Sequence, residues 1–405
     1  LGHVPGSDGT LNIGAASGDT ATGAGTLDAA FVQFGTGASL IVFNHTDTNY
    51  DFDAEISGDG NVMVYGGETV LTGASTYTGA TGVYGGLLTV NGSITSTVTL
   101  LGGALGGTGT VGDVAVDTGG VVAPGNSVGT LTAANMMFGP GSGYEVELND
   151  GGFVAGTNND LVNVTGAVVI GGGTVNVTPE NGTDDGSTYS YGTYTILTAA
   201  GGVTGTFDDV TDDYIFLDFT LGYDANNVYL TSEEALFFTD LARTPNQSAT
   251  AGALQALGNG NAVYDAVVTL AGNDDAARAA YDALSGEVHA SVQTSLVEGS
   301  RLLRDAANDR IRSAFDAGTS PSIPVLAYGK DGLLPEMTGH DAGPALWGSL
   351  FGAFGHTGSD GNAGSYDRAA GGFVAGIDGM VNDTVRLGFL GGFSHSALET
   401  NDRAS

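Results

Sequence analysis

The sequence predicts a mainly β protein, in which a parallel β-helix (solenoid) is followed by an α-helical linker and the first strands of an incomplete antiparallel transmembrane β-barrel. Gly supplies 70 of the 405 residues and charged residues only 14%, a composition typical of short strands joined by many turns. Ala- and Leu-rich sequence with helical spacing begins after Ser232. Near the C-terminus, apolar residues alternate with small or polar ones, which is the period of membrane strands.

The β-solenoid is predicted from residues 71–90, LTGASTYTGATGVYGGLLTV, which contain short apolar runs separated by Gly-rich breaks. These apolar runs and the breaks between them predict strands at 69–71, 82–84 and 87–90. Similar units continue to residue 135. Each unit is too short to bury its apolar face alone, whereas stacked coils of about 20 residues share one continuous core. Seven side chains of the following stretch are expected to point inward: Val98, Leu100, Val111, Val114, Val116, Val121 and Leu131.

Aromatic side chains crowd the C-terminal part of residues 136–232, and we expect this segment to cap the solenoid. An uncovered solenoid end would aggregate, and large rings can cover it. An ordinary β-sandwich core is the alternative interpretation of the same residues. The rings assigned to the cap are those of Tyr214, Phe216, Phe219, Tyr223 and Tyr229.

Residues 233–317 form the predicted helical linker, with Asp274 as a candidate N-cap. Apolar residues recur near helical spacing, and arginines gather on the last helix. A basic helix could thread a polar lumen, although a solvated helix face explains the arginines equally well. Residues 318–344 contain four prolines and are predicted to be a loop. The apolar positions are Val288, Val292, Leu296, Leu303 and Ile311, and the arginines are Arg301, Arg304, Arg310 and Arg312.

Residues 345–405 are interpreted as the N-terminal part of a membrane β-barrel. The lipid-facing side is assigned to Val385, Leu387, Phe389 and Phe393, with Trp347 in an aromatic girdle. A set of soluble hairpins is the alternative. Only about three strands fit before Ser405, whereas a barrel needs about eight to close, and unpaired edges cannot face lipid.

Charge is distributed unevenly along the chain, whose net charge is −35. All ten Lys and Arg residues lie at or beyond Arg243, so residues 1–242 offer no cation to neutralise a phosphate. No nucleic-acid partner is therefore expected for this part. A solvated acidic surface is the simplest interpretation, and calcium coordination by some carboxylates is the alternative. The absence of Cys excludes disulfides, thiol catalysis and Cys-based zinc sites.

One serine lies in a motif used by hydrolases. Residues 125–129 match G-x-S-x-G, but this nucleophile elbow needs a strand before the serine and a helix after it. The sequence after Ser127 continues as a strand, and no His lies between His45 and His289 to act as its base. We expect Ser127 to be inert, so no catalytic residue is predicted.

No metal or cofactor site is predicted either. Residues 106–111 begin like the calcium-binding G-G-x-G-x-D repeat, but Val111 stands where Asp is needed. The best carboxylate cluster lacks EF-hand spacing, and the six His residues show no ligand spacing. That cluster consists of Asp208, Asp209, Asp212 and Asp213.

Several motifs resemble those of autotransporters, the proteins of type V secretion. Residues 71–90 resemble the autotransporter-associated β-strand repeat, and residues 109–131, GTVGDVAVDTGGVVAPGNSVGTL, resemble a hallmark of pertactin-like passengers. LARTPNQ and LSGEVHAS resemble the linker before the translocator, and residues 345–405 its first strands. The resemblance implies a right-handed β-helical passenger over residues 1–135, an autochaperone-like cap over residues 136–232, and a truncated translocator barrel.

The same resemblance implies surroundings and partners. The barrel would lie in the lipid of a Gram-negative outer membrane, with the passenger at the cell surface. Assembly would involve the barrel-assembly machinery and periplasmic chaperones. Some autotransporters release their passengers by cyclisation of an Asn in the barrel-proximal helix, which makes Asn308, followed by Asp309, a candidate cleavage site. An ordinary solvated helix Asn is the alternative.

The predicted function is mechanical. We interpret the chain as an autotransporter fragment that carries its own passenger through the outer membrane and displays a β-helical stalk, with no chemistry in this fragment. Two alternatives remain. The acidic β-helix could itself be an adhesin that binds a surface ligand, or the stalk could carry an enzyme domain located before Leu1.

Overall fold

The computed structural model describes residues 1–149, 152–180, 191–315, 327–329, 332–334, 344–382 and 384–400. Most of the predicted Pro-containing loop, residues 318–344, lies outside these ranges. The chain divides into two compact units. The first comprises Leu1–Leu241 and Gly252–Ala277, and the second comprises Ala242–Ala251 and Arg278–Ser405. The helical linker is therefore shared between the units.

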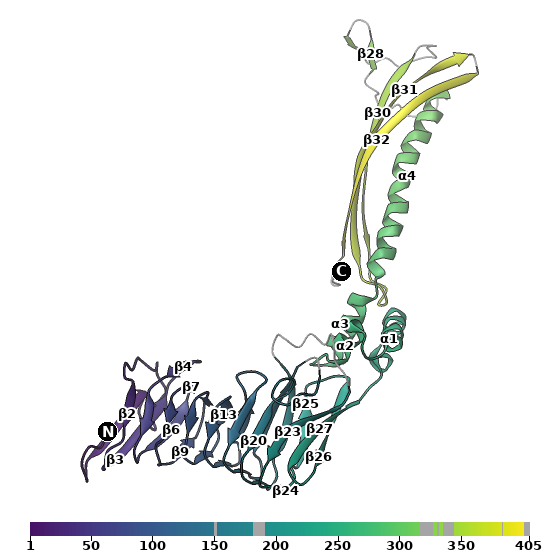
Figure 1. Ribbon diagram of the computed structural model, residues 1–405. Coiled ribbons are helices and arrows are strands. Elements are labelled where there is room, and N and C mark those ends of the chain that lie inside the picture. The colour runs from purple at the N-terminus through teal and green to yellow at the C-terminus, as the bar shows by residue number, and fades with distance from the viewer. Residues whose placement is uncertain are drawn as a thin grey trace. The chain divides into compact units, whose positions relative to one another are not determined.

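The first unit is a parallel β-helix built from three long sheets (Figure 1). The nine-stranded sheet contains β1 (Asp8–Gly14), β3 (Ala38–Asn44), β6 (Asn61–Gly66), β9 (Thr81–Val83), β12 (Val98–Leu100), β15 (Val114–Val116), β18 (Met136–Phe138), β21 (Val168–Ile170) and β24 (Val203–Gly205). One eight-stranded sheet contains β4 (Tyr50–Phe52), β7 (Glu68–Leu71), β10 (Leu87–Val90), β13 (Ala104–Gly107), β16 (Val121–Pro124), β19 (Gly143–Leu148), β22 (Thr174–Pro179) and β25 (Asp209–Asp212).

The other eight-stranded sheet ends in an antiparallel pair. It contains β8 (Ala74–Ser75), β11 (Ser93–Ile94), β14 (Thr110–Val111), β17 (Thr130–Ala133), β20 (Leu161–Val164), β23 (Thr193–Ala199), β27 (Asn227–Glu234) and β26 (Leu217–Tyr223). β27 pairs antiparallel with both β23 and β26, whereas the other pairs of the sheet are parallel. A separate pair is formed by β2 (Phe31–Gln33) and β5 (Glu55–Ser57).

Successive turns stack in register, as the repeat pattern predicted. Thr81 pairs with Val62, 19 positions earlier, and Val98 pairs with Thr81, 17 positions earlier. The turns lengthen toward the C-terminal end, where Val168 pairs with Met136 across 32 positions. The three strands expected between residues 69 and 90 are confirmed as β7, β9 and β10.

The core of the β-helix is a stack of aliphatic side chains without exposed surface, such as Leu88, Leu105 and Val122. Six of the seven expected inward side chains are buried. The exception is Val121, which pairs with Ala104 and Gly143 on the outer face, while the next residue, Val122, points inward. A shift of one residue along a strand reverses the face, and this explains the error.

Tight stacking also explains part of the glycine content. Gly107 has a φ of +100°, and a Cβ there would lie 2.2 Å from the Val90 carbonyl oxygen of the preceding turn. Only glycine tolerates both the backbone conformation and the close approach.

The C-terminal end of the β-helix packs against short helices of the same unit. These elements are η1 (Phe238–Leu241), α1 (Pro245–Leu257), α2 (Ala262–Val268) and α3 (Asp274–Leu284), of which α1 and α3 each cross a unit boundary. The rings of Phe216 and Phe238 have centroids 4.8 Å apart, and those of Phe238 and Tyr264 are 5.0 Å apart. The N-cap contacts of α3 come from Asn273, whose Oδ1 accepts the N–H groups of Asp275 and Ala276, so the expectation of Asp274 as N-cap was wrong by one residue.

The second unit combines one long helix with three long strands. These are α4 (Glu287–Phe315), β30 (Ala345–Thr357), β31 (Tyr366–Asn382) and β32 (Val385–Thr400), and a small hairpin is formed by β28 (Ala327–Gly329) and β29 (Gly332–Leu334). The three long strands form an antiparallel meander, and α4 runs along one face of it (Figure 1). Among the described residues, no helix has the length and apolar character needed to cross a membrane.

Candidate functional site

The C-terminal sheet has two different faces, which cross-strand pairing defines. Residues directly opposite each other share a face. Leu350, Phe373 and Phe393 form one row across the three strands, on the face turned away from α4. Leu346, Ile377 and Phe389 form a second such row, and Phe354, Ala369 and Ala397 a third.

This outer face is strongly apolar and open. Leu350 is 86% exposed, Phe354 88% and Phe389 86%. Single exposed apolar residues are common on proteins, but a continuous apolar face on three strands marks a surface that is covered in use. The structure places Val385, Leu387, Phe389 and Phe393, the residues assigned to lipid, together on this face, and each is exposed.

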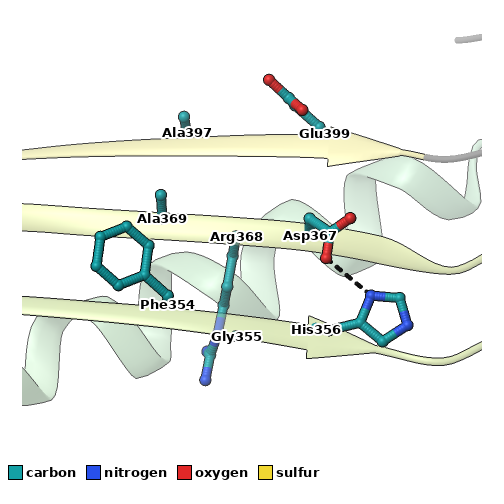
Figure 2. A pocket seen from close by; sticks show the side chains of 8 residues that line it. All are labelled: Phe354, Gly355, His356, Asp367, Arg368, Ala369, Ala397 and Glu399. Carbon is teal, nitrogen blue, oxygen red and sulfur yellow. Dashed lines mark hydrogen bonds and ion pairs between the residues drawn. The ribbon is translucent and has the colours of Figure 1, made fainter.

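The apolar band ends in a row of ionisable side chains. His356, Asp367 and Glu399 lie opposite one another, and His356 Nδ1 is 2.8 Å from Asp367 Oδ1. Figure 2 shows this row beside Phe354, Ala369 and Ala397, where the small alanines leave an open hollow of about 510 Å³.

The height of the band can be estimated from the strand. From Leu387 to Ala397 the outer face is apolar at every position except Gly391 and His395. Ten residues span about 33 Å along a strand, and a tilt of about 40° reduces this to about 25 Å. The apolar belt of an outer-membrane barrel has this height.

The inner face of the sheet packs against α4. Trp347 is only 7% exposed, and the Arg310 guanidinium lies 5.9 Å from the centroid of its ring. Val374 on the neighbouring strand is fully buried. The structure thus places Trp347 on the face opposite to Leu346 and Leu350, so the assignment of this side chain to the lipid-facing set is corrected.

Charged side chains tie the helix to this inner face. Arg310 donates from Nε and Nη2 to the two carboxylate oxygens of Asp378, each at 2.8 Å. Arg386 donates from Nε to Asp378 Oδ1 at 2.6 Å. Closer to the other end of α4, Glu298 pairs with Arg368 of β31. Bidentate Arg–carboxylate pairs are both strong and directional, so the helix has a defined register on the sheet.

Within the described residues, Arg310 alone of the four arginines on this helix pairs with a carboxylate of the sheet. Arg301, Arg304 and Arg312 are exposed on α4, as are Leu296 and Ile311 on its apolar positions. The three described strands therefore leave one side of the helix uncovered. Asp378 was not predicted from the sequence, although a lone carboxylate within an apolar strand is a sign of function in membrane proteins.

The remaining predicted sites are placed as follows. Asn308 and Asp309 are exposed on regular helix, and cleavage there stays a prediction. Ser127 lies between β16 and β17 rather than between a strand and a helix, and its Oγ hydrogen-bonds to Glu180. Among the residues that the structure describes, no three side chains are grouped to hold a metal ion.

The aromatic residues assigned to the cap lie at the C-terminal end of the β-helix. Tyr214, Phe216 and Phe219 are buried. Tyr223 and Tyr229 are half-buried: the Tyr223 hydroxyl accepts the N–H of Phe207, and the Tyr229 hydroxyl donates to Asp224. The role of this layer as a cap in folding stays a prediction.

A buried acid near this end was not predicted. Asp160 accepts the N–H groups of Gly129 and Glu147 at 2.8 and 2.9 Å, and so joins two neighbouring segments. Burial raises its pKa to about 8, and the nearby carboxylates of Glu147 and Glu180 add to the shift. No short sequence motif could have indicated this group, because its partners come from separate turns.

Known proteins match both parts of the chain. The family model "Autotransporter beta-domain" matches residues 346–405, the apolar-faced sheet. An "Extracellular serine protease" of Serratia marcescens is 30% identical over 407 residues, covering 87% of this chain and 37% of that protein. The "Adhesin BmaC autotransporter" of Brucella suis biovar 1 (strain 1330) is 40% identical over 183 residues, covering 42% of this chain and 5% of that protein.

The fold and these matches define the class: an autotransporter, in which a β-helical passenger precedes an outer-membrane β-domain. The resemblance inferred from the sequence motifs is confirmed. The location follows: the β-domain in the outer membrane and the passenger at the cell surface or secreted. The chain spans 37% of the length of the two Serratia marcescens relatives.

Proposed function

We propose that the β-helix is a surface stalk, and that the three C-terminal strands form part of the barrel through which it is exported. The two-faced sheet carries this proposal. Its outer face matches the height of a lipid belt, and its inner face holds α4 through Arg310 and Asp378. A soluble sheet would have no need of an exposed face containing Leu350, Phe354 and Phe389.

The remainder of the barrel is inferred from unpaired surfaces. In the described sheet β30 and β32 each pair on one side only, and in lipid an open strand edge costs several kcal/mol for each unpaired group. The exposed apolar side of α4 also requires a cover. Further strands would satisfy both needs. Until closure, such edges need protection, which fits the barrel-assembly machinery and periplasmic chaperones as partners.

Export would be driven by folding of the stalk. Each turn that forms outside buries several side chains, for example Val62, Val64 and Leu71, and full burial contributes about 1.5–3 kcal/mol for each. A turn is stable only when it stacks on a neighbour. We propose that the antiparallel, aromatic layer at the C-terminal end of the β-helix provides the first such neighbour. If the linker is exported as a hairpin, this end of the β-helix leaves the barrel first.

The test compares two forms of the protein in a Gram-negative host, both with a signal peptide. One form ends at Ser405, and the other is extended by enough strands of the same β-domain to close a barrel. Protease is added to intact cells, with a periplasmic protein as the control for leakage. Digestion of the passenger only in the extended form is expected. Equal surface digestion of the short form would show that the strands make an ordinary soluble sheet.

An adhesin is the second candidate. The observation in its favour is a pair of stacked rings at the C-terminal ends of β6 and β9. Tyr65 and Tyr84 have centroids 5.0 Å apart with planes inclined by 13°, and Tyr84 is 44% exposed. Exposed aromatic residues are common binding anchors. Loss of cell binding by a Tyr84→Ala variant that is displayed normally would favour this role over a passive stalk.

An enzyme role for the whole protein stays open, because two relatives are named serine proteases. Ser127 is not proposed as its nucleophile, since the described surroundings of its Oγ are carboxylate rather than imidazole. A serine-directed probe that labels the protein, with labelling lost in Ser127→Ala, would contradict this assignment.

A further inference from the structure

Two linker motifs, TPNQ at residues 244–247 and LSGE at residues 284–287, meet in the second unit. TPNQ is a helix capping box: Gln247 N–H donates to Thr244 Oγ1 at 3.2 Å, and Thr244 N–H donates to Gln247 Oε1 at 3.3 Å. Pro245 occupies the first helical position, where its missing N–H has no cost. The motif therefore fixes the start of α1.

The same residues reach the end of α3 and the start of α4. Gln247, only 5% exposed, donates from Nε2 to Asp282 Oδ1 at 3.1 Å. Asn246 donates from Nδ2 to Glu287 Oε2, also at 3.1 Å. These contacts join positions 35 and 41 residues apart in the sequence, so they close the linker into a hairpin.

Both motifs also bind the loop between β30 and β31, residues 358–365. Asn246 N–H donates to Asn362 Oδ1 at 2.8 Å, and Asn246 Nδ2 is 3.3 Å from the Asn362 carbonyl oxygen. Glu287 Oε1 accepts the N–H of Gly364 at 2.8 Å. The loop is shaped to present these groups, since Asp360 accepts the N–H groups of Asn362 and Ala363.

We propose that Asn246, Glu287, Asn362 and Gly364 form a clasp that seats the exported chain on the rim of the barrel when export is complete. The inference rests on the proposed export function. The clasp joins the hairpin loop at one end of the strands, while Arg310 contacts Asp378 some 40 Å further along β31, at about 3.3 Å per residue. Glu287 and Arg310 are separated by about 35 Å of helix, so both contacts are compatible with one helix position.

The clasp can form only in one state of export. Asn246 must have emerged on the side of the loop, and α4 must lie along the full sheet to bring Glu287 there. While residues before Asn246 still occupy the lumen, α4 cannot hold this position. Clasp formation would therefore mark the end of outward movement of the linker.

The absence of Cys from the sequence permits a clean crosslinking test. The extended form used in the export test would carry Asn246→Cys with Asn362→Cys. A pulse of synthesis would be followed by oxidation and by protease treatment of intact cells. A disulfide is expected in molecules whose passenger is digestible from outside and not in protected ones. The pair Asn246→Cys with Thr384→Cys, at the opposite hairpin, is the control and should not crosslink.

The outcomes separate the two proposals. Normal display without crosslinking, or equal crosslinking in protected molecules, would overturn the clasp while leaving export intact. Crosslinking without any display would instead contradict the export function and remove the role of the clasp with it.

A second variant tests the contact without Cys. Glu287→Gln replaces one acceptor oxygen by an N–H donor, which must face either Gly364 N–H or the Asn246 amide. Cleavage of displayed protein within residues 242–286 by added protease should rise on the order of tenfold, as expected for the loss of a charge-assisted hydrogen bond. Asp305→Asn removes the same charge at an exposed position of α4 and should change nothing. Equal cleavage of both variants would contradict the clasp.

Discussion

Charge placed on the two faces of the C-terminal sheet should have opposite consequences. Phe393 and Leu390 lie three residues apart on β32 and are 62% and 50% exposed, but Phe393 points away from α4 and Leu390 toward it. If this sheet were soluble, both changes to Arg would be surface substitutions within about ±0.5 kcal/mol of neutral. If the outer face meets lipid, only the change at Phe393 should be severe.

The expected magnitude follows from depth. Phe393 lies near the middle of the apolar band that runs from Leu387 to Ala397. An Arg at the midplane of the lipid face costs about 2–4 kcal/mol, whereas positions facing the lumen accept polar residues. Since about 1.4 kcal/mol corresponds to a factor of ten, Phe393→Arg should weaken membrane insertion by about 30- to 700-fold. Leu390→Arg should insert nearly as well as the unchanged protein.

The measurement is the fraction of folded, membrane-inserted protein, which is determined by denaturant titration in lipid vesicles with the extended form used in the export test. Surface display in cells provides a second readout. Equal loss in the two variants would point to general damage to β32, and equal tolerance would refute lipid contact. Either result would remove the physical basis for the outer and inner faces described above.

Three further results are expected. Burial raises the pKa of Asp160 to about 8, so the folded protein binds this proton more tightly than the unfolded chain does. Stability that is present below about pH 4 should therefore be lost as pH rises to about 8. Urea unfolding across this range should show a loss of several kcal/mol, and Asp160→Asn should abolish this loss. Gly107→Ala should lower unfolding free energy by at least about 1–3 kcal/mol because of its positive φ, whereas Gly299→Ala, in an open helix position, should raise it by about 0.5–1 kcal/mol. Truncation of the fully buried Phe216 to Ala should cost about 3–5 kcal/mol and reduce hydrogen-exchange protection across residues 71–135, and unchanged protection there would contradict a cap.

The fold could be read from the sequence where the signal is local and repeated. The strands between residues 69 and 90 repeat a short apolar unit, and the same unit recurs for several turns. The alternation in β32 likewise placed Leu387, Phe389 and Phe393 on one face. In both cases the period of the backbone determines which side chains share a surface, so no long-range information is needed.

Assignments that depend on a single residue were less secure. Trp347 was assigned by residue type, because aromatic side chains often line membrane borders. Its face, however, is set by its pairing with Gly376, and the indole fits over this glycine and beneath Arg310. The assignment of the Val121 side chain to the core was wrong for the same reason. One position along a strand exchanges the two faces, and composition carries no information about that choice.

The polar contacts of the linker could not be predicted, because their partners are remote in sequence. Arg310 and Asp378 are 68 residues apart, and Glu287 and Gly364 are 77 residues apart. Local patterns identified the helix and the strands but gave no pairing between them. The motifs TPNQ and LSGE were identified only as resemblances, and their chemical role follows from the contact between Asn246 and Glu287.

The two attachments of α4 together define one position of the helix on the sheet. A shift by one helical turn would move Arg310 about 5.4 Å from the Asp378 carboxylate and would move Glu287 equally far from Gly364. A carboxylate or guanidinium left unpaired next to apolar strands is strongly destabilising, so intermediate positions are disfavoured. The helix should therefore occupy its final register or detach altogether, which gives the exported stalk a discrete end point.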